Sequence, residues 1–290
     1  MLCTVGDLVT DVVVKLSGPP VRGTDTPAQI MQTQGGSAAN VALSAIRAEL
    51  PCRFVGRVGE DDRGLSLIRV LEDAGVDVVA QRHGITGSIV VLVDADGERS
   101  FLTDRGAATE LTIDPELVLD GVSWVHLPGY SFGGGAIAES CQLLVAEAKD
   151  RGIPVSVTTA SESFLRDFGR EEFLQLIDVI GPKVVFANTP EAAFALAGGS
   201  HFPNTEWSVI TAGGGATTIT HRTGDHRSIR PPDVEVVDST GAGDSFAGAF
   251  IASMLRNETP LQAVEAGHAS SASTLLRLGS GSGHPATKEL

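Results

Sequence analysis

The sequence Val237-Asp238-Ser239-Thr240-Gly241-Ala242-Gly243-Asp244-Ser245-Phe246-Ala247-Gly248-Ala249-Phe250 places two glycines and a carboxylate where a loop becomes a helix. Gly241 and Gly243 let backbone N–H groups approach a ligand with no side chain in between. The first turn of a helix has unpaired N–H donors and a positive dipole end, so it binds anions readily. Asp244 lies inside that turn, where its carboxylate can accept a proton from a hydroxyl beside the bound anion. Phosphate donors next to a base for an alcohol are what phosphoryl transfer requires.

The composition favours one globular unit. The chain has 290 residues, 42% hydrophobic and 20% charged, with 34 glycines, which predicts a single α/β domain over residues 1–290 with a sizeable core. The formal net charge of −15 argues against nucleic acid or an anionic membrane as a partner. Arginines would carry any cationic role, because the chain has only four lysines: Lys15, Lys149, Lys183 and Lys288.

The cysteines and the N-terminal segment indicate a cytoplasmic protein. Cys3, Cys52 and Cys141 are widely spaced without a CxxC, so they predict neither a disulfide framework nor a zinc site and fit a reducing compartment. Asp7 and Asp11 come early and no basic segment precedes them, so we expect no signal peptide. No apolar run approaches the ~18 residues that a membrane span needs.

The order of apolar segments predicts a mostly parallel sheet with helices on both faces, because short strands alternate with helical segments from residue 122 onward. The expected strands are 2–5, 54–58, 76–80, 124–127, 155–158, 184–187 and 209–211. The expected helices are 37–49, 65–74, 136–151, 171–178, 190–197, 242–255 and 261–278.

A small β appendage is expected beside this body, built from residues 12–20 and 86–104. The second segment is a hairpin around the Asp-Gly turn of Asp94-Ala95-Asp96-Gly97-Glu98. A two-stranded piece cannot cover its own apolar face. We therefore expect it to close over a site as a lid, and its exposed edge to pair with a second subunit in a homodimer.

Two N-terminal segments suit either packing or ligand binding. Gly35-Gly36-Ser37-Ala38-Ala39-Asn40 is either a helix entry capped by Ser37 or a surface that holds the hydroxyls of a polyol through the glycine backbone and the Asn40 amide. Asp11 falls within an apolar run. It lies on the wet side of an edge strand, or it accepts hydrogen bonds from ligand hydroxyls.

Three later segments have the same two interpretations. Asn188-Thr189-Pro190-Glu191 suits the first turn of a helix, or Asn188 and Glu191 position hydrated Mg²⁺ near phosphates. Thr211-Ala212-Gly213-Gly214-Gly215-Ala216 is a glycine-rich turn or a surface for a nucleotide. Arg105 pairs with Asp104 in solvent, or it faces the site and meets a phosphate or an acidic substrate.

Several enzyme classes are excluded by their motifs. The sequence contains no GxxxxGK[ST] and no HExxH. The glycines at 279, 281 and 283 follow a helix rather than a strand, so they form no dinucleotide fingerprint. Gly243-Asp244-Ser245-Phe246 is similar to an esterase block with Ser245 as nucleophile, but the required later Asp-x-x-His is missing.

Together, the block from Gly35 to Ala42 and the block from Asp238 to Phe246 resemble the ribokinase-like (PfkB) family of carbohydrate and nucleoside kinases. The resemblance extends over nearly the whole chain and implies a Rossmann-like α/β sandwich with a β lid. It also implies transfer of the γ-phosphoryl group of ATP to a substrate hydroxyl, with Mg²⁺. One departure is Ala216, where the family usually has a further glycine.

The resemblance assigns roles to individual residues. Asp244 matches the catalytic base, and Gly241, Ala242 and Gly243 match the anion hole. The remaining matches are Asp11, Gly35, Gly36 and Asn40 for substrate hydroxyls, Asn188 and Glu191 for Mg²⁺, Asn188, Thr211 and Gly213 for the nucleotide, and Asp238 for potassium in the members that use it. Arg105 is a further candidate for binding the substrate.

Three functions remain open. A kinase for a sugar or sugar acid is favoured, because the chain is poor in aromatic residues that could hold a nucleobase, with one Tyr, two Trp and eleven Phe. The second is a nucleoside kinase of the same family, which needs an aromatic or apolar platform under the lid. The third is a sugar- or nucleotide-binding protein that has lost turnover, and intact Asp244 and both glycines argue against it.

Overall fold

The computed structural model describes residues 1–94 and 99–277. The strands are β1 (Leu2–Val5), β2 (Val9–Leu16), β3 (Ala28–Gly35), β4 (Cys52–Val58), β5 (Asp77–Arg82), β6 (Thr86–Val93), β7 (Arg99–Gly106), β8 (Trp124–Pro128), β9 (Val155–Thr158), β10 (Val184–Asn188), β11 (Trp207–Thr211), β12 (Thr217–His221) and β13 (His226–Ile229). The helices are α1 (Ser37–Arg47), α2 (Asp62–Asp73), α3 (Pro115–Val118), α4 (Ala136–Asp150), α5 (Glu162–Phe168), α6 (Arg170–Ile180), α7 (Thr189–Leu196), α8 (Ala242–Leu255) and α9 (Pro260–Leu275). The hairpin turn expected at 95–98 and the glycines at 279, 281 and 283 lie outside the described residues.

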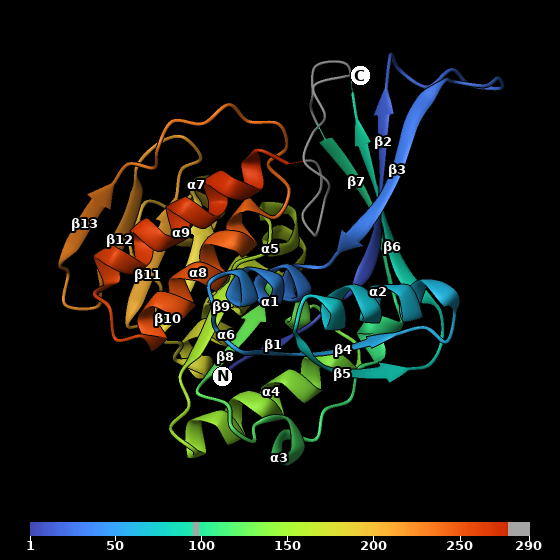
Figure 1. The fold of residues 1–290 in the computed structure, drawn as a ribbon. Helices are drawn as coiled ribbons and strands as arrows, with labels where there is room; N and C mark the ends of the chain where they lie inside the picture. The colour runs from blue at the N-terminus through green and yellow to red at the C-terminus, as the bar shows by residue number, and fades with distance from the viewer. Residues whose placement is uncertain (95–98, 278–290) are drawn as a thin grey trace.

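The main sheet confirms the predicted α/β class. Its order is β13-β12-β11-β10-β9-β8-β1-β4-β5, and the strands from β11 to β5 are parallel, whereas β12 and β13 continue antiparallel. Helices cover both faces (Figure 1). One core cluster joins the sheet to α1, α2, α8 and α9, and a second joins the opposite face to α3–α7. This layering leaves the carboxyl ends of the parallel strands at one edge, where α/β proteins bind ligands.

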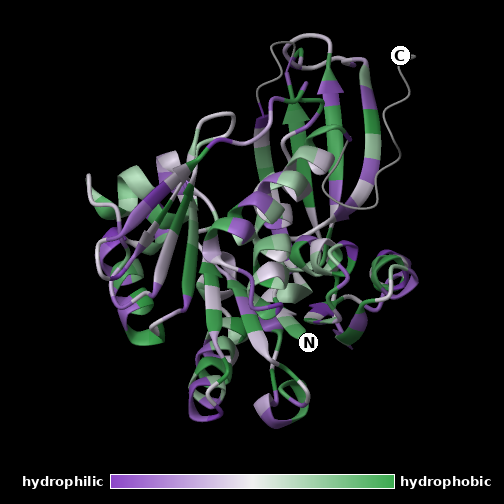
Figure 2. Ribbon diagram, turned by 60° about the vertical axis from the view of Figure 1, so that its left-hand side comes forward, coloured by the Kyte–Doolittle hydropathy of each residue, from purple (hydrophilic) through white to green (hydrophobic). Residues whose placement is uncertain are grey.

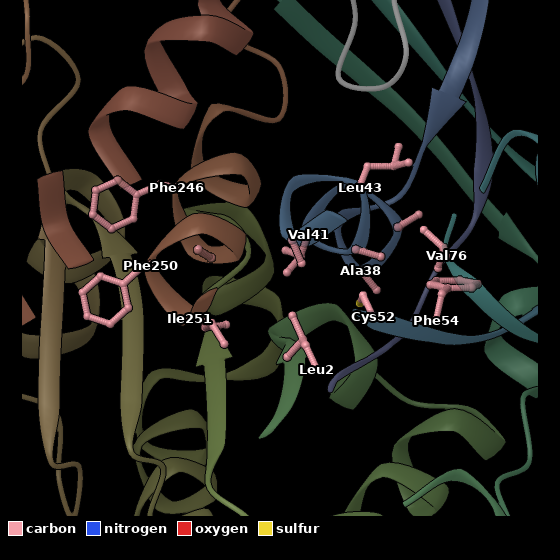
Figure 3. Packing of buried hydrophobic residues seen from close by; sticks show 14 of the residues in the cluster. Leu2, Ala38, Val41, Leu43, Cys52, Phe54, Val76, Phe246, Phe250 and Ile251 are labelled. Carbon is pink, nitrogen blue, oxygen red and sulfur yellow. The ribbon is translucent and has the colours of Figure 1, made fainter. Parts of the chain in front are cut away.

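Helix α8 is placed by close packing against its neighbours. Phe246, Phe250 and Ile251 lie in the core with residues of α1 (Figure 3). A Cβ at Gly248 would approach the Ser44 side chain of α1 to 2.6 Å, so glycine is what lets α1 and α8 come this near. The first turns of the two helices therefore lie side by side.

A second, small sheet stands to one side of the body (Figure 1). Its order is β3-β2-β6-β7, with β2 parallel to β6 and the outer pairs antiparallel. The sequence analysis expected residues from β2, β6 and β7 here but missed β3. The segment Ala28–Gly35 has polar residues at Gln29, Gln32, Thr33 and Gln34, so its apolar alternation is weak. Pairing with β2 along its full length makes it a strand.

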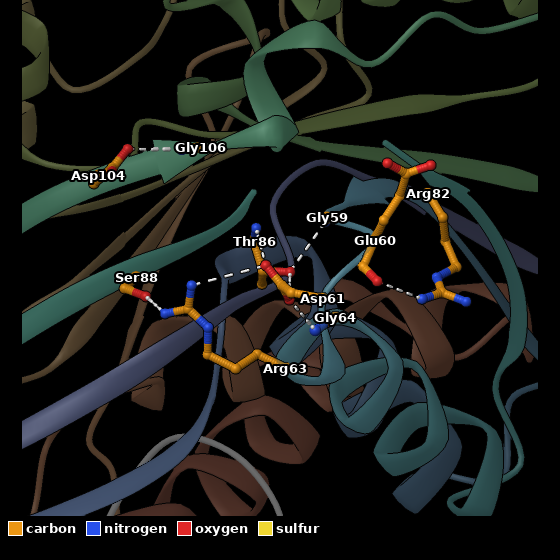
Figure 4. A network of polar contacts seen from close by, with 10 residues as sticks. All are labelled: Gly59, Glu60, Asp61, Arg63, Gly64, Arg82, Thr86, Ser88, Asp104 and Gly106. Carbon is orange, nitrogen blue, oxygen red and sulfur yellow. Dashed lines mark hydrogen bonds and ion pairs between the residues drawn. The ribbon is translucent and has the colours of Figure 1, made fainter. Parts of the chain in front are cut away.

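The small sheet is fixed to the body at Asp61 (Figure 4). One Asp61 oxygen accepts from Gly64 N at 2.9 Å, which caps α2, and from the Thr86 hydroxyl at 2.6 Å. The other accepts from Thr86 N at 2.9 Å, where β6 begins. A single carboxylate thus joins the start of a body helix to the root of the small sheet.

Among the described residues, no helix has the length and apolar character needed to cross a membrane.

Candidate active site

Asp244 lies between the first turns of α1 and α8. The Ser37 hydroxyl donates to one carboxylate oxygen at 2.6 Å, and the Asn40 amide donates to the other at 2.9 Å. The residue stays partly accessible to solvent. The carboxylate is therefore held in one orientation without being sealed in the interior, as a base for an incoming hydroxyl requires.

The surroundings of Asp244 bring its pKa close to neutral pH. Burial acts most strongly and raises the pKa of Asp244 from 3.8 to about 6, with a smaller contribution from the charge of Glu191. The hydrogen bonds from Ser37 and Asn40 act the other way, because they stabilise the ionised form. A base of this pKa is ionised at pH 7 and can still hold a proton during transfer.

Next to Asp244, the start of α8 has the features of an anion site. Gly241 is the N-cap in the left-handed region, with φ of 74°. Ser245 N donates to Gly241 O at 2.8 Å, so the amides of Gly243 and Asp244 precede the first helical bond of this turn. Gly243 is exposed, and a Cβ built on it would meet no atom within 4 Å. The Cα of Gly243 therefore borders open space at the start of α8.

Asp11 lies on β2 with Gly35 opposite its carboxylate. A Cβ at Gly35 would come within 2.1 Å of Asp11 Oδ1, so glycine makes room for the carboxylate. Gly36 has φ of 103°, and its Cβ would meet Asp7 O at 2.1 Å. Asp11 is 6% exposed, and among the described residues its Oδ1 has no hydrogen-bond partner. A buried acceptor without a donor can accept a hydrogen bond from a ligand hydroxyl.

Burial, followed by the charges of Asp244 and Asp238, raises the pKa of Asp11 to about 7. The charges of Asp244 and Asp238 thus reach Asp11, and a phosphate must be brought into this negatively charged site.

Ser37 and Asn40 both donate hydrogen bonds to Asp244, and neither caps helix α1. The N-cap of α1 is Gly36, which makes no side-chain cap, so the expectation that Ser37 caps the helix is wrong. Asn40 donates to Asp244, while its Oδ1 accepts from Gln34 Nε2 at 3.1 Å. Gln34 was not among the expected site residues, because the strand that carries it, β3, was itself not expected.

Two arginines reach the site from β7. Arg105 makes a two-pronged ion pair with Asp7, with N–O distances of 2.7 and 2.8 Å, rather than a pair with Asp104. Arg99 Nη2 lies 2.7 Å from Asp238 Oδ1, and its Nη1 donates to the Ser239 hydroxyl at 2.9 Å. The sequence analysis missed Arg99, because its partners are about 140 residues away.

Asn188 and Glu191 form a capping box at the start of α7. Asn188 Oδ1 accepts from Glu191 N at 3.0 Å, and Glu191 Oε2 accepts from Asn188 N at 2.9 Å. The Thr159 hydroxyl also donates to Glu191. Burial raises the pKa of Glu191, and the bonds from Thr159 and Asn188 oppose that rise. Asn188-Thr189-Pro190-Glu191 therefore forms the first turn of a helix, as one of its two interpretations predicted. The Glu191 carboxylate is also close enough to Asp244 to raise the pKa of Asp244.

On the same edge, Asn188 pairs with Thr211 at the ends of β10 and β11. Gly213 follows in an exposed turn with φ of 57°, and a Cβ there would meet nothing within 4 Å. The residues expected to hold a nucleotide thus lie beside those expected to organise a metal. No group of three His, Cys, Asp or Glu side chains that could hold a metal occurs within residues 1–94 and 99–277.

The chain is similar to known proteins over most of its length. The model of the pfkB family of carbohydrate kinases matches residues 1–287. An ATP-dependent ribose-1-phosphate kinase of Halopiger xanaduensis is 33% identical over 261 residues, which cover 86% of this chain and 82% of that protein. A ribokinase of Arabidopsis thaliana is 29% identical over 276 residues, covering 89% and 71% of the two chains.

Solved structures share the fold at lower identity. An adenosine kinase from Sinorhizobium meliloti superimposes with a TM-score of 0.85 at 19% identity, covering 96% of this chain and 94% of the other. An E. coli protein assigned as Ribokinase II, in complex with ATP and Mg²⁺, has a TM-score of 0.82 at 20% identity, with coverage of 96% and 94%.

Proposed function

This chain belongs to the pfkB family of carbohydrate kinases, which are phosphotransferases that act on hydroxyl groups, and from that premise we propose that it transfers the γ-phosphoryl group of ATP to a sugar or sugar acid. The observation that carries the proposal is that a fixed, partly accessible Asp244 carboxylate lies beside the exposed Gly243 in the first turn of α8, where backbone amides have no helical partner. One group suits an alcohol proton and the other suits the phosphoryl oxygens.

The reaction follows from the positions of these groups. The substrate lies between the body and the small sheet, with hydroxyls on Asp11 and Asn40. ATP lies along residues 188–216, with its γ-phosphate at the anion hole of Gly241, Ala242 and Gly243. Asp244 takes the proton of the attacking hydroxyl, whose oxygen bonds to the γ-phosphorus as the bond to ADP breaks. The small sheet acts as the lid of this single domain and limits hydrolysis by excluding water.

Asn188 and Glu191 fit a Mg²⁺ ion that binds together with ATP. Both Glu191 oxygens already accept hydrogen bonds, and the described residues offer no three-residue metal cluster. Mg²⁺ usually keeps several waters and binds through few carboxylates together with phosphates. Asn188 and Glu191 would therefore hold it through water, where it neutralises charge on the phosphates.

The chemistry near Asp11 favours a polyol, since a buried carboxylate oxygen without a donor suits a sugar hydroxyl. The H. xanaduensis relative is named for a phosphorylated sugar, ribose 1-phosphate, so such sugars belong among the candidates. Arg105 is the residue proposed to attract an anionic substrate, although Asp7 balances its charge in this structure. Its replacement by Gln should raise the KM for anionic substrates only.

A nucleoside kinase is the second candidate, and the small sheet supplies its support. By strand register, Met31 and Phe101 share the face of Asp11, two residues along, and they are 39% and 55% exposed. Val13 and Val91 lie between them in the same row across the sheet, and this apolar row is the platform that a nucleobase would need.

An assay of ADP formation over sugars, sugar acids, sugar phosphates and nucleosides tests the proposal, with Asp244→Asn as the control for contaminating kinases. Turnover confined to sugars or their acids supports it, and turnover confined to nucleosides selects the second candidate. Absence of turnover with every class would refute catalysis and leave a binding protein.

We also propose a homodimer formed through the small sheet. By strand register, Ile30 and Leu102 lie on the face opposite to Asp11, and they are 66% and 58% exposed. The green parts of the small sheet in Figure 2 mark further hydrophobic residues in its strands. Sedimentation of Ile30→Lys should show a monomer, and an unchanged mass would refute this interface. A cytoplasmic location stays a prediction.

A further inference from the structure

Arg99 is the one described basic side chain that forms an ion pair with the segment leading into the anion hole. Its guanidinium lies 2.7 Å from Asp238 Oδ1 and donates to Ser239 Oγ at 2.9 Å. The same Oδ1 accepts from Thr240 N at 2.7 Å. The side chains of Arg99 and Asp238 are 21% and 8% exposed, so the pair is largely shielded from solvent. Residues 238–240 are thus held immediately before the N-cap Gly241.

This arrangement does not fit the monovalent cation that the family resemblance places at Asp238. A cation bound to that carboxylate would be next to the guanidinium. Two positive charges about 4 Å apart, at an effective dielectric constant near 20, repel strongly enough to weaken cation binding roughly a thousandfold. Weak monovalent sites cannot overcome such a loss. Arg99 would have to leave before potassium could bind.

The site nevertheless needs a positive charge near the anion hole. Asp238 and Asp244 both lie near enough for their charges to act on Asp11, and the chain as a whole carries −15. A phosphoryl group that gathers negative charge must enter this field. The helix dipole and magnesium supply part of the compensation, and a fixed cation behind the hole supplies more.

We propose that Arg99 is a built-in replacement for the monovalent cation, so that this kinase works without potassium. Arg99 acts as a positioning residue, because it holds Asp238 and Ser239 rather than contacting the reacting atoms. It belongs to β7 of the small sheet, so its charge reaches Asp238 only when that sheet lies against the body. The proposal rests on the kinase function proposed above.

The test compares wild type, Arg99→Ala and Arg99→Lys in KCl and in choline chloride at equal ionic strength. Thermal unfolding is measured alongside kcat, so that the comparison remains informative if no substrate is turned over. Arg227→Ala is the matched control, because it removes an exposed Arg–Asp pair with Asp225 away from the site.

For the wild type, we expect the same kcat and the same unfolding temperature in both salts. Arg99→Ala should lose at least tenfold in kcat in choline chloride with little change in KM, and KCl should restore kcat and raise its unfolding temperature. Arg99→Lys should retain more activity than Arg99→Ala, and Arg227→Ala should respond to neither salt.

Stabilisation or activation of the wild type by K⁺ over choline would overturn the proposal. So would a defect in Arg99→Ala that neither K⁺ nor the lysine variant restores, because charge would then not be what Arg99 provides. Failure of the wild type to phosphorylate any substrate would instead refute the kinase function and leave the unfolding comparison valid.

Discussion

Replacing Asp244 by asparagine removes the proposed base while keeping the shape of the side chain. The side-chain oxygen of the introduced asparagine can still accept from the Asn40 amide, and its NH₂ group can donate to Ser37 once that hydroxyl rotates. The fold and the substrate contacts should therefore survive. A positioned general base contributes about 10²–10⁴ in rate, which corresponds to about 3–5 kcal/mol in the activation barrier.

We expect Asp244→Asn to lose about 10²–10⁴ in kcat and to bind the substrate as the wild type does. A coupled assay of ADP release measures kcat, and calorimetry measures the substrate dissociation constant. Asp62→Asn is the matched control, because it makes the same change in the first turn of α2, on a residue away from the site. A kcat within tenfold of wild type would show that Asp244 is not the base.

Protonation of Asp244 should lower kcat/KM at acidic pH. Because burial raises the pKa of Asp244 to about 6, the ionised form is lost below that pH. Wild-type kcat/KM should fall about tenfold per pH unit below about 6. The residual activity of Asp244→Asn should lack this fall, and a fall that persists in the variant would assign it to another group.

Three further predictions concern the anion hole, the substrate carboxylate and the root of the small sheet. Gly243→Val should abolish turnover, because the valine side chain blocks the approach of the phosphate. The variant should still unfold at the wild-type temperature, because a Cβ at this position meets no atom within 4 Å. Wild-type turnover in this variant would count against the anion hole. Asp11→Asn should raise the unfolding temperature more at alkaline than at acidic pH. The fold raises the pKa of Asp11 from 3.8 to about 7, so the folded protein binds this proton more tightly than the unfolded chain does. The stability that the proton provides is complete below about pH 4 and is lost as the pH rises through 7, and asparagine removes this loss. A gain that does not vary with pH would contradict that reasoning. Asp61→Ala should lower the free energy of unfolding by about 1–3 kcal/mol, measured by urea denaturation, since three donors lose their acceptor; an unchanged midpoint would show that the root does not depend on Asp61.

Local features of the chain were enough to predict the body of the fold. Alternating apolar segments gave the parallel strands and most of the helices, because period and turn chemistry act over a few residues. Gly241, Gly243 and Asp244 likewise indicated an anion site from their place at a helix start. The same local signals failed for β3, whose polar residues become a strand only through pairing with β2.

The amino-acid sequence by itself determined the layers, the helix start proposed to bind the phosphate and the identity of its carboxylate, since each depends on residues adjacent in the chain. Only the tertiary structure decided which groups hold that carboxylate and which arginine pairs with Asp238. Ser37 and Asn40 meet Asp244 across more than 200 residues, and Arg99 meets Ser239 across 140. Contacts of that separation are set by the order of strands in the two sheets and by the close approach of α1 to α8, which no local pattern encodes.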